Sequence, residues 1–178
     1  FLSSMNIDAL VQFFFPKRCS FCGRIGKDPC PECEKDIKFI SGNVCKKCGI
    51  PIGDSAYDKC PRCLKERFYF DRAIAPFYYE GPVRRGIHLF KYKGFYQNSL
   101  TFSKIMAQKI RECRIDFDLI VPVPLSKERF LERGYNQTML LSKGISKLFD
   151  VKCCDILIRT KTTKPFHNLS KIQRRKEI

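Results

Sequence analysis

The chain has 178 residues and a formal net charge of +16, from 34 basic and 18 acidic side chains. Its 44% hydrophobic content allows a real core, whereas its longest apolar stretch near the start is far too short to span a bilayer, so we expect no membrane insertion. The basic excess favours polyanionic partners such as nucleic acid or phosphorylated ligands, although solvated lysine faces are an alternative.

The N-terminal part is dominated by cysteine. Leu10, Val11 and Phe14 are expected to pack a short helix against the segment 19–63, which holds eight of the 11 cysteines as four Cys-x-x-Cys pairs. Two such pairs supply four thiolate ligands for one tetrahedral zinc, so the sequence predicts two zinc ions and a charge of about +12 with both bound. The predicted ligands are Cys19, Cys22, Cys30, Cys33, Cys45, Cys48, Cys60 and Cys63.

The two halves of this segment are similar. Cys-Ser-Phe-Cys-Gly at 19–23 matches Cys-Lys-Lys-Cys-Gly at 45–49, and a Cys-Pro-x-Cys pair follows each. This favours a duplicated zinc ribbon in which successive pairs share one zinc, while a cross-braced pairing stays open. A disulfide framework is the alternative, but it needs an oxidising compartment and no secretory signal peptide is recognisable. We therefore expect metal binding in the cytoplasm.

From about Phe70 the composition changes, and strand-like segments alternate with helical ones. We divide the chain into an N-terminal helix with a double zinc ribbon at 1–68 and a second domain at 69–178. Alternating strands and helices predict an α/β domain with a parallel sheet. The expected strands are 71–79, 119–123 and 155–159, and the expected helices are 82–90, 99–113 and 138–149.

A phosphate site is expected in the loop after strand 119–123, because ligands of parallel sheets bind beyond the carboxyl ends of the strands. The loop combines prolines, glycine and arginines, and the free N–H groups of helix 138–149 begin just after it. A proline-rich connection with solvated arginines is the alternative. The candidates are Pro124, Leu125, Arg129, Arg133, Gly134 and Asn136, with Arg174 and Arg175 of the basic tail able to swing toward them.

Basic and aromatic residues interleave between positions 84 and 96. Such a pattern can neutralise the backbone and stack the bases of single-stranded DNA, and an amphipathic helix with a basic outer face is the alternative. The two histidines, His88 and His167, are too isolated to form a catalytic pair, so the catalytic residues stay unknown. The candidate DNA-binding residues are Arg84, Arg85, Lys91, Tyr92 and Lys93.

Three motifs together resemble the ComF family of competence-type, phosphoribosyltransferase-like proteins. They are Phe15-Pro16-x-x-Cys19-x-x-Cys22-Gly23, Lys91-Tyr92-Lys93-Gly94, and Val121-Pro122-Val123-Pro124-Leu125 followed by Arg129-x-x-x-Arg133-Gly134-Tyr135-Asn136-Gln137. The resemblance covers nearly the whole chain. It implies a type I phosphoribosyltransferase fold with a site for phosphoribosyl pyrophosphate, in which the loop after 119–123 corresponds to the pyrophosphate loop and 161–176 to a mobile loop.

The family is associated with uptake of single-stranded DNA in natural transformation. The resemblance therefore implies an accessory protein of DNA uptake that binds single-stranded DNA and zinc, with a DNA-uptake helicase or other competence proteins as partners. The alternative is an active phosphoribosyltransferase that uses phosphoribosyl pyrophosphate in nucleotide metabolism.

The sequence also departs from the family pattern. Phe166 stands where members often carry Gln, and Glu177 stands where Asn is common. An acidic pair followed by Thr-Thr-Gly, which binds ribose and 5′-phosphate in type I phosphoribosyltransferases, does not occur. We therefore expect a C-terminally truncated domain, with phosphoribosyl pyrophosphate as a ligand of the full-length protein.

Overall fold

The computed structural model describes residues 16–160 together with Ser170 and Gln173. The expected N-terminal helix, Arg174, Arg175 and nearly all of the expected mobile loop at 161–176 lie outside the described residues. Within the described part, the elements in chain order are α2 (Pro31–Asp36), α3 (Pro61–Lys65), α4 (Gly81–Tyr92), α5 (Asn98–Glu112), β1 (Leu119–Ile120), α6 (Lys127–Arg133), α7 (Gln137–Phe149) and β2 (Lys152–Cys153).

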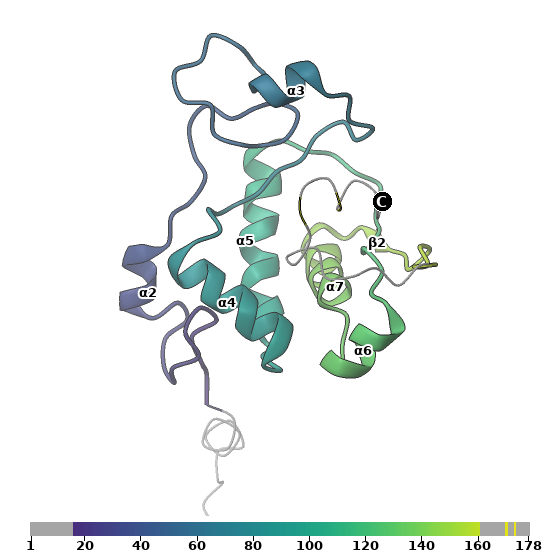
Figure 1. Cartoon of the computed structure of the whole chain (residues 1–178). Helices are drawn as coiled ribbons and strands as arrows, with labels where there is room; N and C mark the ends of the chain where they lie inside the picture. The colour runs from purple at the N-terminus through teal and green to yellow at the C-terminus, as the bar shows by residue number, and fades with distance from the viewer. Residues whose placement is uncertain (1–15, 161–169, 171–172, 174–178) are drawn as a thin grey trace, which may run out of the picture.

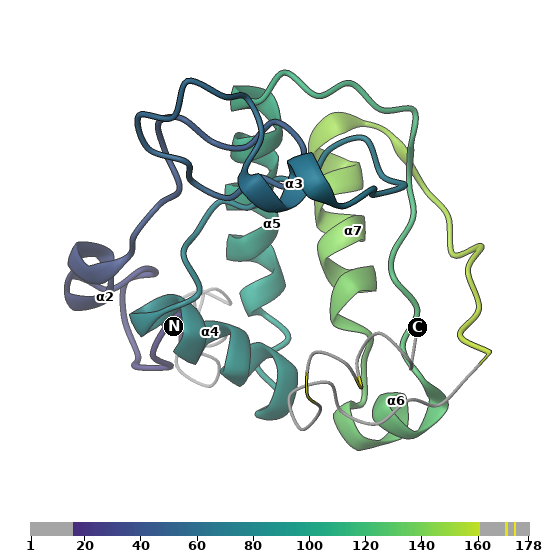
Figure 2. The ribbon, with the colours of Figure 1, turned by 45° about the horizontal axis from the view of Figure 1, so that its top comes forward.

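Three longer helices form the frame of the molecule. Helices α5 and α7 lie side by side, and α4 crosses near one end of α5 (Figures 1 and 2). Helix α2 lies beside α4, whereas α3 lies at the far end of α5 (Figure 1). The positions of α4, α5 and α7 confirm the helices expected from the apolar spacing. None of the helices in the described part is long and apolar enough to cross a membrane.

The sheet is parallel, as expected, but it is much smaller than the sequence suggests. Leu119 pairs with Lys152 and Ile120 with Cys153. The predicted strand 119–123 stops after Ile120, because Pro122 and Pro124 have no N–H to donate to a ladder. A mixed fold with a small parallel sheet is thus established.

Two predicted strands are wrong. The segment 71–79 makes only an isolated antiparallel bridge, Phe39 to Phe77, because its backbone hydrogen bonds go to the cysteine-rich segment rather than to a neighbouring strand of the sheet. The segment 155–159 forms no strand either, because the pairing with β1 ends where the N–H of Cys154 donates to Ile120 O at 3.0 Å. The side chain of Ile158 beyond it is 86% exposed.

Helix α6 was not expected from the sequence. The segment predicted to be a loop is instead a short helix joined to α7 by a tight turn. Ser126 caps α6 by accepting a hydrogen bond from the N–H of Arg129, and Gly134 ends it with a φ of 77°, a left-handed conformation that favours glycine. Asn136 then caps α7 by accepting from the N–H of Thr138 at 3.0 Å. The two caps fix the turn between the helices.

The main core joins the first half of the cysteine-rich segment to the helices. Phe21 is fully buried, and its ring meets that of Phe102 edge-on at 5.5 Å. Gly86 lets α4 approach closely, since a Cβ there would lie 2.6 Å from Ser20 O. The core comprises Cys19, Phe21, Cys33, Val83, Phe90 and Phe102. This core spans the boundary at residue 68, and the division into two domains stays a prediction.

Candidate metal centres and basic surface

The first cysteine cluster is built from a tight turn and the start of a helix. The turn is closed by the N–H of Gly23, which donates to Cys19 O at 2.8 Å. Cys30 caps α2 and Cys33 lies in its first turn, with proline at the first helical position, where no N–H is needed. The N–H of Cys30 also donates to Cys19 Sγ at 3.4 Å, which ties the two pairs together.

The second cluster repeats this construction, with a longer loop between its two pairs. The N–H of Gly49 donates to Cys45 O at 2.9 Å, and the N–H of Cys60, at the start of α3, donates to Cys45 Sγ at 3.3 Å. In each cluster the four sulfur atoms lie within 4.8 Å of one another. The first and second pairs therefore meet, as do the third and fourth, which agrees with the sequential rather than the cross-braced arrangement.

The sulfur spacing fits zinc. Cys22 Sγ lies 3.7 Å from Cys30 Sγ, and Cys48 Sγ lies 3.7 Å from Cys60 Sγ. A disulfide needs about 2.05 Å, whereas the edge of a tetrahedron with Zn–S bonds of about 2.3 Å is about 3.8 Å. All eight sulfurs are free thiols in the structure. The two clusters therefore suit two zinc ions, as the sequence predicts.

The thiols of one cluster do not ionise alike. Burial raises the pKa of Cys22, but the backbone N–H and the guanidinium of Arg24 outweigh it and lower the pKa to about 6. Burial and the adjacent thiols raise the pKa of Cys33 to about 12. In the second cluster, backbone N–H groups outweigh burial and lower the pKa of Cys45 to about 6, while burial raises that of Cys63 to about 12. A divalent cation stabilises all four thiolates, so its binding displaces the remaining protons.

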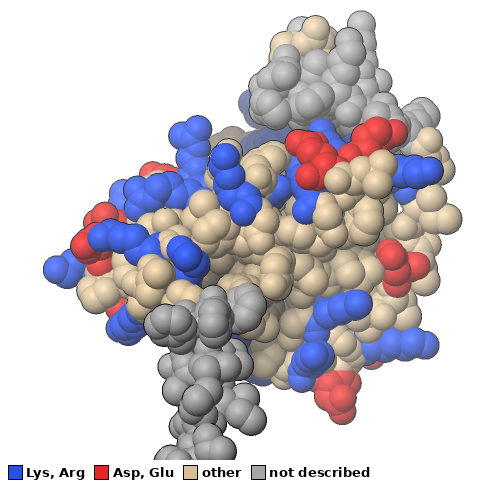
Figure 3. Space-filling model, turned by 90° about the horizontal axis from the view of Figure 1, so that it is seen from below, with Lys and Arg blue, Asp and Glu red and all other residues tan. Residues whose placement is uncertain are grey.

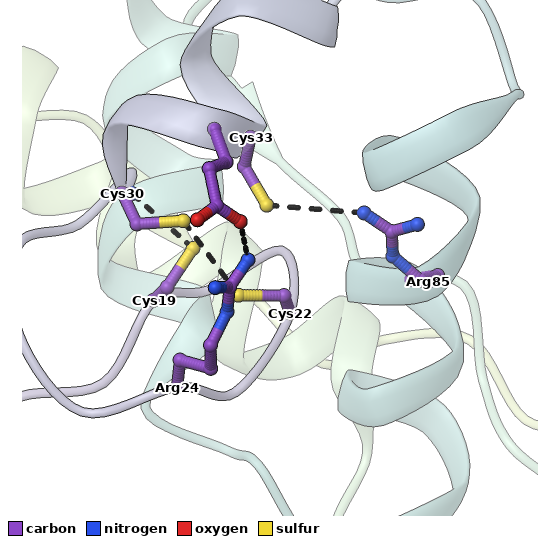
Figure 4. Close-up of polar contacts among 7 residues, drawn as sticks. Cys19, Cys22, Arg24, Cys30, Cys33 and Arg85 are labelled. Carbon is purple, nitrogen blue, oxygen red and sulfur yellow. Dashed lines mark hydrogen bonds and ion pairs between the residues drawn. The ribbon is translucent and has the colours of Figure 1, made fainter.

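Two arginines flank the first cluster (Figure 4). Arg85 of α4 donates to Cys33 Sγ at 3.9 Å. Arg24 pairs with the carboxylate of Glu32, and the neighbouring Cys22 thiolate raises the pKa of its guanidinium. A zinc with four thiolates carries a net charge of about −2, so these arginines offset the charge of an occupied centre. The first centre is thereby linked to α4.

Helix α4 also presents a basic hollow next to the first cluster. Arg84, Arg85, Lys91 and Tyr92 line it, so the structure brings together four of the five predicted DNA-binding residues. The fifth, Lys93, is the C-cap of α4 and lies outside the lining. Lys and Arg side chains outnumber Asp and Glu on the face that Figure 3 shows, where they surround a central area of uncharged residues and histidine.

His88 and Tyr79 also line this hollow. His88 belongs to the interleaved segment 84–96 but is not among the five candidates, and Tyr79 lies outside that segment. The imidazole of His88 lies against the ring of Tyr92 with centroids 4.9 Å apart. The spacing of His88 and Tyr92, one helical turn apart, could have indicated this stack. Tyr79 is 63% exposed and comes from the segment just before α4.

The predicted phosphate-site residues fall into two groups. A groove of about 630 Å³ runs beyond β1 and β2, and four of the candidates, Pro124, Leu125, Gly134 and Asn136, line it. Its charged lining residues, Lys127, Asp155 and Arg159, are not among the predicted candidates.

Arg129 and Arg133 are not among the lining residues of this groove. The guanidinium of Arg133 instead stacks over the ring of Tyr92, with Cζ 4.8 Å from the ring centroid. The two other candidates, Arg174 and Arg175, lie outside the described residues.

Two tandem four-cysteine clusters, each formed by a turn and a helix start, define a double zinc ribbon protein. In agreement, the family described as a double zinc ribbon domain matches residues 10–64. The chain is 31% identical over 175 residues to Competence protein F of Haemophilus influenzae, covering 93% of this chain and 75% of that protein. On this similarity and the double zinc ribbon, the chain belongs to the ComF family.

Other relatives agree. Competence protein ComFC of Bacillus subtilis is 29% identical over 132 residues, which cover 66% of this chain and 51% of that protein. DNA utilization protein YhgH of Escherichia coli K12 is 26% identical over 155 residues, covering 84% of this chain and 67% of that protein. The chain thus spans about half the length of the Bacillus protein and about two thirds of the Escherichia protein. No solved structure matches the chain.

Proposed function

We propose that this protein is a cytoplasmic accessory factor that handles single-stranded DNA during DNA uptake, with two zinc ions as structural elements. The names of its relatives, competence and DNA utilization proteins, support a role of this kind. The observation that carries the DNA-binding part is the basic hollow on α4, where Arg84, Arg85 and Lys91 are grouped with exposed aromatic rings.

The chemistry of the hollow suits a single strand better than a duplex. Arg84, His88 and Lys91 lie about one turn apart on one side of α4, so their positive or polar groups can follow a phosphate backbone. Tyr79 and Tyr92 offer exposed ring faces, and bases can stack on such rings only when they are not already stacked in a duplex. A DNA-uptake helicase or another competence protein is the partner that this role would require.

The test is a titration of fluorescent single-stranded DNA at two salt concentrations, with duplex DNA in parallel. The double variant Arg84→Ala/Arg85→Ala removes two charges from the hollow. We expect its affinity to fall about tenfold and the slope of log K against log salt to decrease by about 1.4, which is 0.7 for each lost phosphate contact. Because Arg85 also donates to Cys33 Sγ, the zinc content of the variant is measured as well. An unchanged zinc content shows that the loss of affinity comes from lost DNA contacts and not from damage to the first cluster.

Lys143→Ala/Lys147→Ala is the matched control, because it removes the same charge from the exposed side of α7. Its affinity should stay within about twofold of the parent protein. An equal loss in both double variants would show that DNA responds only to net charge, and the hollow would then not be the site.

The second candidate function is that of a phosphoribosyltransferase using phosphoribosyl pyrophosphate. The groove beyond the parallel pair β1–β2 favours it, because ligands of parallel sheets bind at that edge and Lys127 and Asn136 line it. If the protein is a phosphoribosyltransferase, residues 69–178 form the phosphoribosyltransferase-like domain and residues 1–68 form the zinc module.

Calorimetry with phosphoribosyl pyrophosphate tests the second candidate. Binding should weaken several-fold in Lys127→Ala, which removes a cation from the groove, and should be unchanged in Lys143→Ala. The titration uses the full-length protein, and an absence of binding to it at millimolar ligand would argue against this function and leave the DNA-binding proposal standing.

A further inference from the structure

A second group of cations lies where the end of α4 meets the turn between α6 and α7. Tyr135 in this turn donates a hydrogen bond to the carbonyl of Phe90, and the two rings pack with centroids 5.9 Å apart. Arg133 lies over the ring of Tyr92. The turn is therefore fixed against α4, and it carries the guanidinium of Arg133 next to Lys91.

Two buried hydrogen-bond donors at this junction have no partner among the described residues. Nη1 of Arg133 donates to Oε1 of Gln137 at 3.0 Å. This contact leaves Arg133 Nε and Gln137 Nε2 buried and unpaired in the described part of the chain. Gln137 is only 5% exposed. Buried polar groups nearly always have partners, and because both atoms are donors, the missing partner is an acceptor such as an oxygen.

The electrostatics of the junction point to an anion. Desolvation lowers the pKa of Lys91, and the charges of Arg133 and Arg129 lower it further. The three cations repel one another, so an anion placed among them relieves this repulsion while supplying acceptor oxygens to the unpaired donors. Gln137 is also the first residue of α7, whose free N–H groups favour negative charge.

We propose that Lys91, Arg133 and Gln137, with the charge of Arg129 nearby, form a binding site for a phosphate monoester. A monoester carries a charge of about −2 near neutral pH, whereas each diester of a nucleic-acid backbone carries −1. The three neighbouring cations, Lys91, Arg129 and Arg133, therefore match a doubly charged monoester better than a singly charged diester. These residues do not line the groove beyond β1 and β2, although Gly134, Tyr135 and Asn136 of the same turn do, so the two sites adjoin.

The position of the site indicates where the phosphate comes from. Lys91 belongs both to this junction and to the basic hollow of α4, so a strand lying along the hollow would bring its end to Arg133. The ligand is thus the 5′-terminal phosphate of single-stranded DNA. This choice of source rests on the proposed DNA-handling function, whereas the phosphate site itself does not.

The experiment compares a short single-stranded oligonucleotide with a 5′-phosphate and the same oligonucleotide with a 5′-hydroxyl, and it titrates ribose 5-phosphate separately by calorimetry. The parent protein should bind the phosphorylated strand about tenfold more tightly, because charged hydrogen bonds are gained. This ratio should fall toward one in Lys91→Met and in Arg133→Lys, which keeps the charge but removes Nε. Gln137→Met preserves the side-chain volume and should give the same result.

Lys93→Met is the matched control. It removes a lysine from the same end of α4 and should lower the affinity for both strands equally, so the ratio should persist. Melting temperatures of all variants show whether each one is folded, and the Arg133→Lys and Gln137→Met variants test the site independently of each other.

Three outcomes decide the matter. A ratio lost in the three site variants and kept in Lys93→Met supports the site and its DNA source. Binding of ribose 5-phosphate that the same variants abolish, without any preference between the strands, supports the phosphate site but overturns the DNA source. An absence of both effects in the parent protein overturns the site, even where DNA binding through the hollow is intact.

Discussion

The two zinc ribbons use the same ligands in the same order, but they have different surroundings. In the first, Cys19 and Cys33 are almost fully buried and pack into the main core with Phe21, Val83 and Phe102. The cysteines of the second form a core of their own, in which the packed hydrophobic residues besides cysteine are Ile52 and Phe68. The first ribbon is therefore part of the frame that carries α4, whereas the second depends mainly on its own metal.

Polar contacts strengthen this difference. Asp28 of the first ribbon accepts hydrogen bonds from the N–H of Ser20 at 2.7 Å and from the hydroxyl of Thr101 in α5 at 2.6 Å. Asn98 at the start of α5 donates to Ser20 O at 2.8 Å. The second ribbon instead exposes aromatic rings, and Tyr69 beside it is 94% exposed. Identical ligand spacing thus indicates the metal but not the structural role of a ribbon.

The largest effect is expected from removing a ligand of the first ribbon. Cys33→Ser should abolish one zinc site and, because Cys33 lies in the main core, destabilise α4 and α5 as well. Structural zinc contributes about 10 kcal/mol or more of binding free energy in small zinc domains, so most of the cooperative fold should be lost. Elemental analysis gives the zinc content, and circular dichroism gives the helical signal. A variant with full helical signal and a normal melting transition would contradict this prediction.

The matching change in the second ribbon should act locally. Cys63→Ser should also lose one zinc and not both, since the two clusters share no ligand. The helical signal should persist, and limited proteolysis should cut mainly between residues 44 and 68. The prediction fails if both zinc ions leave together, because the two centres would then behave as one unit.

Substitution of one glycine beside each ribbon compares, with a smaller expected effect, how much each ribbon contributes to global stability. A Cβ at Gly86 would lie 2.6 Å from Ser20 O in the main core, and a Cβ at Gly49 would lie 2.6 Å from Ala73 O beside the second ribbon. Gly86→Ala should lower the free energy of unfolding by about 3 kcal/mol through overpacking.

Gly49→Ala adds strain at a φ of 73°, yet it should change global unfolding by less than about 1 kcal/mol. Denaturant unfolding monitored by the helical signal measures both variants. Equal losses of global stability would remove the distinction between the ribbons.

The smallest effect is expected at the hydrogen bond between Asp28 and Thr101. Thr101→Val keeps the shape but removes a hydroxyl that joins α5 to the first ribbon, so the free energy of unfolding should fall by about 1 kcal/mol. Ser99→Ala on the same helix is the control, because its hydroxyl bonds only locally to Tyr96 O. If both variants unfold at the same denaturant concentration, Asp28 does not stabilise the junction.

Local features of the sequence predicted the structure well. The Cys-x-x-Cys pairs predicted both clusters because each pair is held by its own turn, and the apolar spacing predicted α4, α5 and α7. The caps of α6, Ser126 and Gly134, are also visible in the sequence and could have revealed this helix.

Features set by tertiary packing could not be predicted in this way. The segment 71–79 has the composition of a strand, but its hydrogen-bonding partners are residues of the cysteine-rich segment, far away in the sequence. The same holds for Arg133. Its position after strand 119–123 indicated the groove, whereas its stacking on Tyr92 depends on how the turn packs against α4. The sequence therefore drew attention to Arg133 but could not show that it packs against Tyr92.

Hydrogen exchange during stepwise zinc removal tests most directly whether the two ribbons differ. A chelator is added in increments, and exchange is measured by mass spectrometry in α4, in α5 and in residues 44–68 while the zinc content is followed. We predict that the first zinc to leave exposes residues 44–68 and leaves α4 and α5 protected, and that protection of both helices is lost only with the second zinc. Loss of protection in α4 and α5 together with residues 44–68 at the first step would contradict the account.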